Sequence, residues 1–539
     1  MCVPASGPGV WPLWALLIAL PWLNPHAGGP SPVIAPWLFT ALCAAIVFAT
    51  RRRVQFHASL ALALSALAGW ALVRTGATAE TLALAGACLV TFLGACAASE
   101  KCDSIDRAIA WGLLCAALVS TAIALLQYFR VESALEPWVS LSSVGEAYAN
   151  LRQRNQFATL TVVGMASLIW LERGGLHRWI AVAAMSWLAI GNAATTSRTG
   201  LLQILALAIA SGIWPGRRRE RMVLVVGALL AYSVAAALLP FALEEWQDVA
   251  AGRLWERVAA VDACSSRTQL WSNVLHLIGQ KPWTGWGWGE LDYAHFMTLY
   301  PGQRFCDILD NAHNLPLHLA VELGIPAALA VCGAVLWATV RAKPWTETDP
   351  ARQMAWGALA VIGLHSLVEY PLWYGPFELA VGLCLGLLLP NPRPTPASPV
   401  SAWVQRGIAA LAIAICAYAA WDYWRVSQVY LLPEARARGY RDDPLAAARK
   451  SWLFRNQARF AELTLTPLTL NNASWIATTA AELLHYSPEP RVIEKLIESL
   501  LLLGRNDEAL WHMARFRAAF PADYASWRGA GGAAAALKD

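Results

Sequence analysis

The stretch DNAHNLPLHLAVELG, residues 310–324, opens an apolar run that continues to Val340. Its first residues include an acid, two amides and a histidine, which stand together where the run begins. Polar side chains at the point where a chain enters lipid are costly unless they pair with one another or face water. The stretch therefore predicts a functional site at the end of a membrane-spanning helix.

The composition of the whole chain indicates a membrane protein. Of its 539 residues, 57% are hydrophobic and 14% are charged, whereas soluble domains carry about 25% charged residues. The 28 tryptophans agree with this, because indole rings favour the membrane interface. A net charge of +5 without a basic tract or nucleic-acid motif argues against nucleic acid as a partner. The N-terminus has no Lys or Arg before its apolar run, so it predicts a first span rather than a cleaved signal peptide.

Apolar runs of spanning length, about 17 to 25 residues, recur from end to end. They lie near 11–23, 33–50, 55–73, 79–98, 108–129, 155–171, 179–193, 200–214, 222–243, 313–340, 354–370, 373–390 and 407–424. We therefore expect an all-α, polytopic integral membrane protein with about 12–13 transmembrane helices.

The charges of the loops orient these spans, because excess Lys and Arg mark the cytoplasmic side. With the N-terminus inside, every dense basic loop falls on that side: 51–53, 101–107, 173–178, 217–221 and 341–352. The periplasmic loops are then 130–154, 194–199, 244–312 and 371–372, and the unusual polar residues lie on this face. Chemistry there has no ATP, so the substrate must arrive already activated.

Two parts of the predicted periplasmic face are too long to be simple connectors. Loop 244–312 should carry structure or a site, and its Cys264 and Cys306 are candidates for a disulfide in an oxidising compartment. From about 425 the chain becomes charged, with apolar residues at helical spacing. We therefore divide the chain into a transmembrane domain, 1–424, and a helical periplasmic domain, 425–539, with a tetratricopeptide-like hairpin that turns at 504–507.

His313 and Asn314, followed after nine residues by Gly324, resemble the signature of bacterial O-antigen ligases and the related protein O-oligosaccharyltransferases. Ala327 is a mild departure, since the pattern has another small or hydroxyl residue there. The resemblance covers about 150–375, and the amphipathic tail is similar to that of pilin-glycosylating ligases. It implies a GT-C-like membrane fold and transfer of a glycan from undecaprenyl diphosphate to an acceptor beyond the inner membrane.

His313 has two interpretations. Taken alone, it would anchor a helix start at the interface, hydrogen-bonded to Asn311 or Asp310. In the resemblance it is the base, or a positioning group, for the acceptor hydroxyl, because imidazole titrates near neutral pH. Asn314 beside it would position glycan or acceptor.

Arg198, in TTSRTG, and Arg267, in SSRTQLW, lie on the predicted periplasmic face. Each alone fits an arginine that snorkels at a membrane edge. Both also sit where ligases of this superfamily carry arginines, and a guanidinium matches phosphate oxygens bidentately. The resemblance therefore implies that they hold the diphosphate.

Amides and tyrosines on the same face are candidates for glycan or acceptor positioning. Gln153 and Asn155 resemble the Gln-x-Asn element of protein O-oligosaccharyltransferases, although a polar helix start is the competing interpretation. Tyr370 corresponds to a functional tyrosine of those enzymes, with Tyr374 in reserve. The loop GWGWGE, 285–290, fits an interface anchor or a sugar or lipid platform.

Two histidine–glutamate couples at a spacing of four residues predict structural pairs within one helix. They are His318 with Glu322 and His365 with Glu369.

The resemblance implies a membrane glycosyltransferase, for which we expect no cofactor. We also expect no divalent metal, because no carboxylate cluster of metal-site type lies on the outer face. Its partners would be the undecaprenyl-diphosphate glycan, membrane lipids and a periplasmic or pilin protein with an acceptor Ser or Thr. Alternatives are transfer to lipid A core, polymerisation of the glycan on its carrier, and a transporter, which would place charges at mid-membrane.

Overall fold

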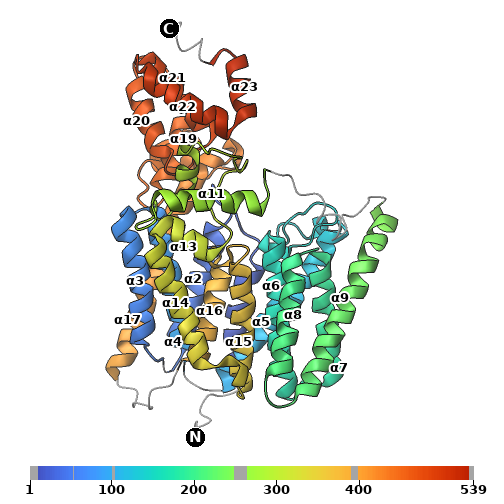
Figure 1. Cartoon of the computed structure of the whole chain (residues 1–539). Helices are drawn as coiled ribbons and strands as arrows, with labels where there is room; N and C mark the ends of the chain where they lie inside the picture. The colour runs from blue at the N-terminus through green and yellow to red at the C-terminus, as the bar shows by residue number, and fades with distance from the viewer. Residues whose placement is uncertain (1–9, 53, 100–102, 248–263, 390–398, 533–539) are drawn as a thin grey trace.

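The computed structural model describes residues 10–52, 54–99, 103–247, 264–389 and 399–532. Within these ranges the chain forms α- and 3-10 helices and no β-strand. Figure 1 shows a broad bundle of long helices with a smaller group of C-terminal helices above one side of it.

The bundle follows the predicted spans, each of which overlaps a helix. Its helices are α1 (Trp11–Leu23), α2 (Ile34–Thr50), α3 (Ala58–Thr75), α4 (Ala79–Ala98), α5 (Asp103–Tyr128), α6 (Arg154–Arg173), α7 (Arg178–Ala194), α8 (Arg198–Ile213), α9 (Arg218–Gln247), α14 (Ile325–Ala342), α15 (Pro350–Ser366), α16 (Gly375–Leu388) and α17 (Pro399–Ser427). Among the described residues, six of these are long and apolar enough to cross a membrane: α3, α4, α5, α9, α14 and α17. The prediction of an all-α, polytopic membrane protein is confirmed.

Small residues let two central helices of the bundle approach closely. A side chain on Gly382 or Gly386 of α16 would meet the backbone of α4, with a Cβ 2.3 Å from the carbonyl oxygen of Thr91 or 2.4 Å from that of Ala95. Close backbone approach through glycine is a common way for helices to associate in lipid, where burial of apolar surface gives little drive. The contact fixes α16, whose first residue follows Tyr374 of the predicted site.

The prediction of one continuous span over 313–340 was wrong, because the helix breaks at Gly324. Helix α13 (Leu315–Leu323) ends there, and α14 begins at the next residue. Gly324 has a φ of 91°, which favours glycine, and a Cβ there would lie 2.3 Å from the carbonyl oxygen of Trp283. The short α13 is therefore a separate element that carries the polar cluster, and the apolar span begins after it.

Two helices of the predicted periplasmic loop, α11 (Arg267–Gln280) and α12 (Leu291–Met297), are described. Figure 1 shows α11 lying across the top of the bundle, beneath the C-terminal helices. Cys264, just before α11, forms a disulfide with Cys306, and their Cα atoms are 5.4 Å apart. The disulfide joins the start of α11 to the segment that leads into α13.

The C-terminal region consists of α18 (Pro444–Ala448), α19 (Arg455–Leu465), α20 (Ala473–Leu483), α21 (Pro490–Leu502), α22 (Asn506–Ala519) and α23 (Pro521–Gly529). Helices α21 and α22 form the predicted hairpin, with Gly504 in the turn at a φ of 73°. Phe296 of α12 belongs to the core of this region, and Arg515 donates from Nε to the carbonyl oxygen of Met297 at 2.9 Å. The region is thus packed on the loop; its assignment to the tetratricopeptide type stays a prediction.

Candidate active site

Residues predicted from separate stretches meet around one carboxylate, that of Glu369 in the turn after α15. Its Oε2 is 2.8 Å from Nδ1 of His313, and its Oε1 accepts a hydrogen bond from Nη2 of Arg267. Nδ2 of Asn155 lies 3.5 Å from the same Oε1. The Glu369 side chain is 8% exposed, so it is a buried acid with a histidine and an arginine at its two oxygens.

The assignment of Glu369 to a structural pair with His365 was wrong. Nδ1 of His365 instead lies 2.9 Å from Oγ1 of Thr159, which also bonds to Gln203. His365 is fully buried among these helices, whereas Glu369 lies beyond the last turn of α15. The spacing of four residues allowed the pair, but the helix ends before Glu369 and the carboxylate turns to other segments.

Four helices begin at this site, each with a side chain that caps a backbone N–H of its first turn. The capping residues are Gln153 of α6, Ser197 of α8, Ser266 of α11 and Asn314 of α13. Helix N-termini carry partial positive charge and favour anions. Glu369 bonds to Asn155 of α6, to Arg267 of α11 and to His313 before α13, and Ser197 of α8 bonds to Asn155; we call these residues the Glu369 cluster. The cluster joins the four helix ends, so the site is suited to a negatively charged ligand.

The backbone of His313 has an unusual conformation, with a φ of 49°. Side chains other than glycine rarely adopt this left-handed region, and such residues gather at functional sites. The N–H of His313 donates to Oδ1 of the buried Asn311 at 2.9 Å, which holds the turn. Because Nδ1 faces the carboxylate of Glu369, the neutral imidazole carries its proton there, and Nε2 keeps a lone pair.

The charge on Glu369 follows from its surroundings. Burial raises the pKa of this carboxyl, but the hydrogen bond from His313 and the positive charge of Arg267 outweigh burial and lower the pKa below its usual range. Glu369 is therefore ionised at neutral pH. It provides the negative charge that orients both of its partners.

Tyr370 and Tyr374 lie beside the histidine. The Tyr370 ring meets that of His313 edge-on, with centroids 4.8 Å apart, and it stacks on Tyr374 at 6.0 Å. Burial, with nearby Tyr374 and acidic groups, raises the pKa of Tyr370, so its hydroxyl stays protonated. Trp373 stacks on Trp288 at 5.8 Å, which brings the predicted loop 285–290 to the edge of the same aromatic cluster.

The two predicted arginines differ in their contacts. Arg267, with a side chain 41% exposed, pairs with Glu369. Arg198 is exposed at the first position of α8, and no other described residue forms a hydrogen bond or ion pair with its side chain. Its neighbour Ser197 donates to Oδ1 of Asn155 at 2.7 Å. Arg198 therefore lies at a helix start that is tied to the cluster, without touching His313 or Glu369.

The side chains of the predicted amide residues Gln153 and Asn314 form hydrogen bonds within the protein. Gln153 accepts the N–H of Gln156 through Oε1 at 2.7 Å, which agrees with the competing interpretation of a polar helix start. Asn314 accepts the N–H of Leu317 at 3.0 Å and donates to the carbonyl oxygen of Leu367 at 2.9 Å. Both residues hold backbone segments of the site in place, and their contact with glycan or acceptor stays a prediction.

Sequence reasoning missed the role of Glu369 and of the caps Ser197 and Ser266. Glu369 carried one signal: an ionisable residue at the end of an apolar helix, directly before Tyr370. Its partners are more than 100 residues away for Arg267 and more than 50 for His313, so no local spacing pointed to them.

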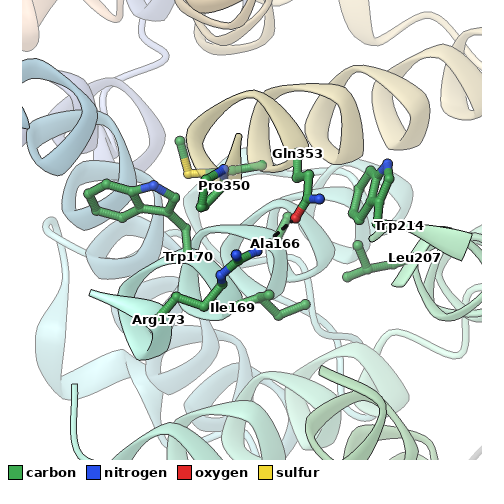
Figure 2. Close-up of a pocket in the computed structure, with 9 residues that line it drawn as sticks. Ala166, Ile169, Trp170, Arg173, Leu207, Trp214, Pro350 and Gln353 are labelled. Carbon is green, nitrogen blue, oxygen red and sulfur yellow. Dashed lines mark hydrogen bonds between the residues drawn. The ribbon is translucent and has the colours of Figure 1, made fainter. Parts of the chain in front are cut away.

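A separate small pocket lies at the other end of the same helices. Figure 2 shows it between α6, α8 and α15, with Nη1 of Arg173 donating to Oε1 of Gln353 at 2.9 Å. Its lining is mostly apolar and includes Trp170, Leu207 and Trp214. The Arg173–Gln353 pair is already hydrogen-bonded, and the rest of the lining is mostly apolar. We therefore interpret this pocket as part of the packing between the helices and not as a ligand site. Across the described residues, no three His, Cys, Asp or Glu side chains are grouped to hold a metal ion.

Three family models match consecutive parts of the chain. A protein glycosylation ligase model matches residues 147–171, an O-antigen ligase model matches 183–332, and a model for the C-terminal part of a virulence factor membrane-bound polymerase matches 353–533. The first match contains Asn155, the second contains both arginines and His313, and the third contains Glu369.

Proteins similar to this chain are named as O-oligosaccharyltransferases or as an O-antigen ligase. A general O-oligosaccharyltransferase of Acinetobacter baylyi is 26% identical over 446 residues, which are 78% of this chain and 77% of the relative. A ComP-specific O-oligosaccharyltransferase of the same species is 25% identical over 53% of this chain and 52% of the relative. An O-antigen ligase of Pseudomonas aeruginosa is 25% identical over 52% of this chain and 59% of the relative. The predicted resemblance to O-antigen ligases and protein O-oligosaccharyltransferases is confirmed.

Proposed function

We propose that this chain is an oligosaccharyltransferase that moves a glycan en bloc from undecaprenyl diphosphate to a Ser or Thr hydroxyl of a protein. The names of its relatives support this class of reaction. One observation carries the proposal for this chain: His313, the candidate base, and Arg267, the candidate diphosphate ligand, meet on Glu369 at one end of a membrane bundle.

The reaction needs a base and a group that stabilises the leaving diphosphate. The acceptor oxygen forms a bond to the anomeric carbon of the first sugar, and the bond from that carbon to the phosphate oxygen breaks. The hydroxyl proton passes to Nε2 of His313, which is the free nitrogen of a ring oriented through Nδ1. Negative charge grows on the departing diphosphate, where Arg267 and Arg198 stabilise it.

The surroundings of the cluster suit both substrates. Four helix N-termini favour the diphosphate. The hydroxyl of Tyr370 donates to Tyr374, so its oxygen is an acceptor for sugar hydroxyls, and the amide of Asn155 both donates and accepts. The aromatic rings beside His313 provide an apolar wall for a sugar face.

The site faces the periplasm in this proposal, and the protein resides in the bacterial inner membrane. The helices support the orientation, because the dense basic loops 173–178 and 341–352 lie at the ends of α6 and α15 away from the cluster. Helix α6 begins in the cluster at Arg154 and ends at Arg173, and α15 begins next to Arg173 and ends before Glu369. The predicted cytoplasmic charges and the predicted site are therefore separated by the length of the bundle.

Transfer to lipid A core is the second candidate, since one relative is named an O-antigen ligase. The donor and the base would be the same, and only the acceptor would differ. The C-terminal helices pack on α12 at the site end of the bundle. If they are of the predicted tetratricopeptide type, they would bind a protein there, which favours a protein acceptor.

Co-expression tests the choice of acceptor. A strain that makes a lipid-linked glycan, a pilin protein and complete lipid A core would receive this chain or its His313→Ala variant. We expect the glycan on the pilin protein with the unaltered chain and on neither acceptor with the variant. Glycan on lipid A core alone would establish the second candidate, and glycan on neither acceptor with the unaltered chain would refute both.

A further inference from the structure

Glu369 stands between the two functions of the site. It holds His313 with one carboxylate oxygen and Arg267 with the other. The exposures of the three side chains differ: 8% for Glu369, 20% for His313 and 41% for Arg267. The carboxylate is therefore fixed among the helices. The guanidinium of Arg267 is partly exposed to solvent and has room to turn towards a ligand that arrives from there.

We propose that Glu369 is a positioning residue that links donor binding to the base. In the donor-free protein, Arg267 is held by Glu369. When the donor arrives, Arg267 turns to the diphosphate and leaves the carboxylate to His313. This inference rests on the proposed function, and it assigns to the reaction a residue that does not itself touch the reacting atoms.

The exchange has a physical cause. A diphosphate offers more negative charge and more acceptor oxygens than one carboxylate, and a guanidinium binds such oxygens with a fork of N–H groups. Once the positive charge of Arg267 has moved away from Glu369, the carboxylate acts more strongly on the imidazole of His313. A positive imidazolium is then favoured as the acceptor hydroxyl loses its proton.

Asn155 prevents the exchange from leaving a buried oxygen without a partner. Its Nδ2 is 3.5 Å from the Oε1 of Glu369 that Arg267 occupies, so a small movement makes it the replacement donor. Such a replacement matters because an unsatisfied buried carboxylate oxygen is costly. The other end of this amide accepts from Ser197, next to Arg198. The second arginine is thereby connected to the same change.

A purely structural clamp would behave differently. If Glu369 only tied α11 to the turn after α15, its loss would loosen the site, weaken donor binding and slow transfer together. The proposed exchange instead predicts opposite effects on the two quantities. Glu369 competes with the donor for Arg267 and supports His313, so its removal should help donor binding and harm the rate.

The test compares Glu369→Gln with the unaltered protein in detergent. Binding is measured with undecaprenyl diphosphate as the probe, and rate is measured per folded molecule with saturating lipid-linked glycan and acceptor protein. We expect the rate to fall by about 100-fold or more while the probe binds as tightly as before or more tightly. Weaker binding together with the slower rate, or a rate above about a tenth of normal, overturns the proposal.

Three further variants make the result specific. The double variant His313→Ala, Glu369→Gln should be no slower than His313→Ala, because the carboxylate acts on the rate through the histidine. If Glu369→Gln does not fold, Glu369→Asp keeps the charge but shortens the reach, and it should show the same loss of rate without weaker binding. Glu322→Gln is the matched control, since this buried glutamate pairs with His318 away from the exchange.

The binding arm separates the inference from the proposed activity. If the unaltered protein transfers no glycan, yet Arg267→Ala loses the probe and Glu369→Gln keeps it, the exchange stands and the proposed activity fails. If transfer occurs but Glu369→Gln binds the probe more weakly, the activity stands and the exchange fails.

Discussion

Two histidine–glutamate pairs lie close together in this protein. They differ in burial, in the separation of their partners along the chain and in their remaining contacts. His318 and Glu322 are four residues apart in α13, with Nε2 and Oε2 3.2 Å apart and side chains 2% and 1% exposed. His313 and Glu369 are 56 residues apart, with Nδ1 and Oε2 at 2.8 Å. We call the first the sealed pair and the second the open pair.

The remaining contacts of each pair explain what it can do. In the sealed pair, Glu322 also accepts the N–H of Gly289 at 3.0 Å, and Nδ1 of His318 receives the N–H of Ala312 at 3.4 Å. Both imidazole nitrogens of His318 are thus occupied by the protein. In the open pair, no described residue bonds to Nε2 of His313. The same two residue types therefore form a structural brace in one place and, in the proposed reaction, position the base in the other.

The largest expected effect separates the two histidines directly. His313→Ala should lower the transfer rate by about 10²–10⁴-fold, the contribution of a general base, while the amount of folded protein and the binding of lipid donor remain close to normal. The measurement is activity per folded molecule at saturating donor and acceptor.

His318→Ala is the matched comparison, because it removes the same side chain from the sealed pair. A His313→Ala rate above about a tenth of normal would show that the open pair is also an anchor. The base would then have to be another group.

The next effect concerns the arginine of the open pair. Arg267→Lys keeps the charge but loses the fork that grips two phosphate oxygens. Donor binding should weaken about 10-fold or more, as expected for a lost charge-assisted hydrogen bond. Arg517→Lys in α22 is the control, since this exposed arginine lies far along the chain from the site. Equal effects of the two changes on the titration with lipid donor would remove Arg267 from the diphosphate site.

The sealed pair should affect stability rather than rate. His318→Ala leaves a buried oxygen of Glu322 without the donor that His318 provides, and an unsatisfied buried acceptor costs about 1–3 kcal/mol, so the variant should have a lower thermal midpoint and a lower yield of folded protein. The molecules that do fold should keep a rate within about twofold of normal, because His318 has no nitrogen available for a substrate. A rate loss comparable to that of His313→Ala would show that the comparison between the pairs is mistaken.

These pairs also show what the sequence could predict. Hydropathy and helical spacing found the helices of the bundle and the sealed pair, because both depend on residues close together in the chain. The same rule misassigned Glu369 to His365, since spacing does not reveal that α15 ends at Ser366. The contacts of Glu369 with His313 and Arg267 depend on packing between distant segments, which only the three-dimensional structure shows.

The break at Gly324 was missed for a related reason. Hydropathy is continuous through this residue, so the run appeared to be a single span. The cause of the break is a tertiary contact: the N–H of Ile325 donates to the carbonyl oxygen of Pro282 at 2.8 Å, and the backbone of Trp283 occupies the place of a side chain at Gly324. A glycine inside an apolar run was the local signal, and it marked a close approach of backbone rather than a flexible point.

The last expected effect concerns Cys264 and Cys306, whose disulfide constrains the turns that lead to Arg267 and His313. The disulfide lies three residues before Arg267 and seven before His313, and it joins cysteines separated by 42 residues. A cross-link over such a loop stabilises by about 4 kcal/mol through the unfolded chain, so the double variant Cys264→Ser, Cys306→Ser should be clearly less stable. Its rate per folded molecule should fall only a few-fold, because Ser266 and Asn311 still hold the two turns.

Thiol labelling of the unaltered protein should find two more free thiols after reduction than before. Equal labelling before and after reduction would show that the bond is absent in the purified protein, and the two turns would then depend on their hydrogen bonds alone.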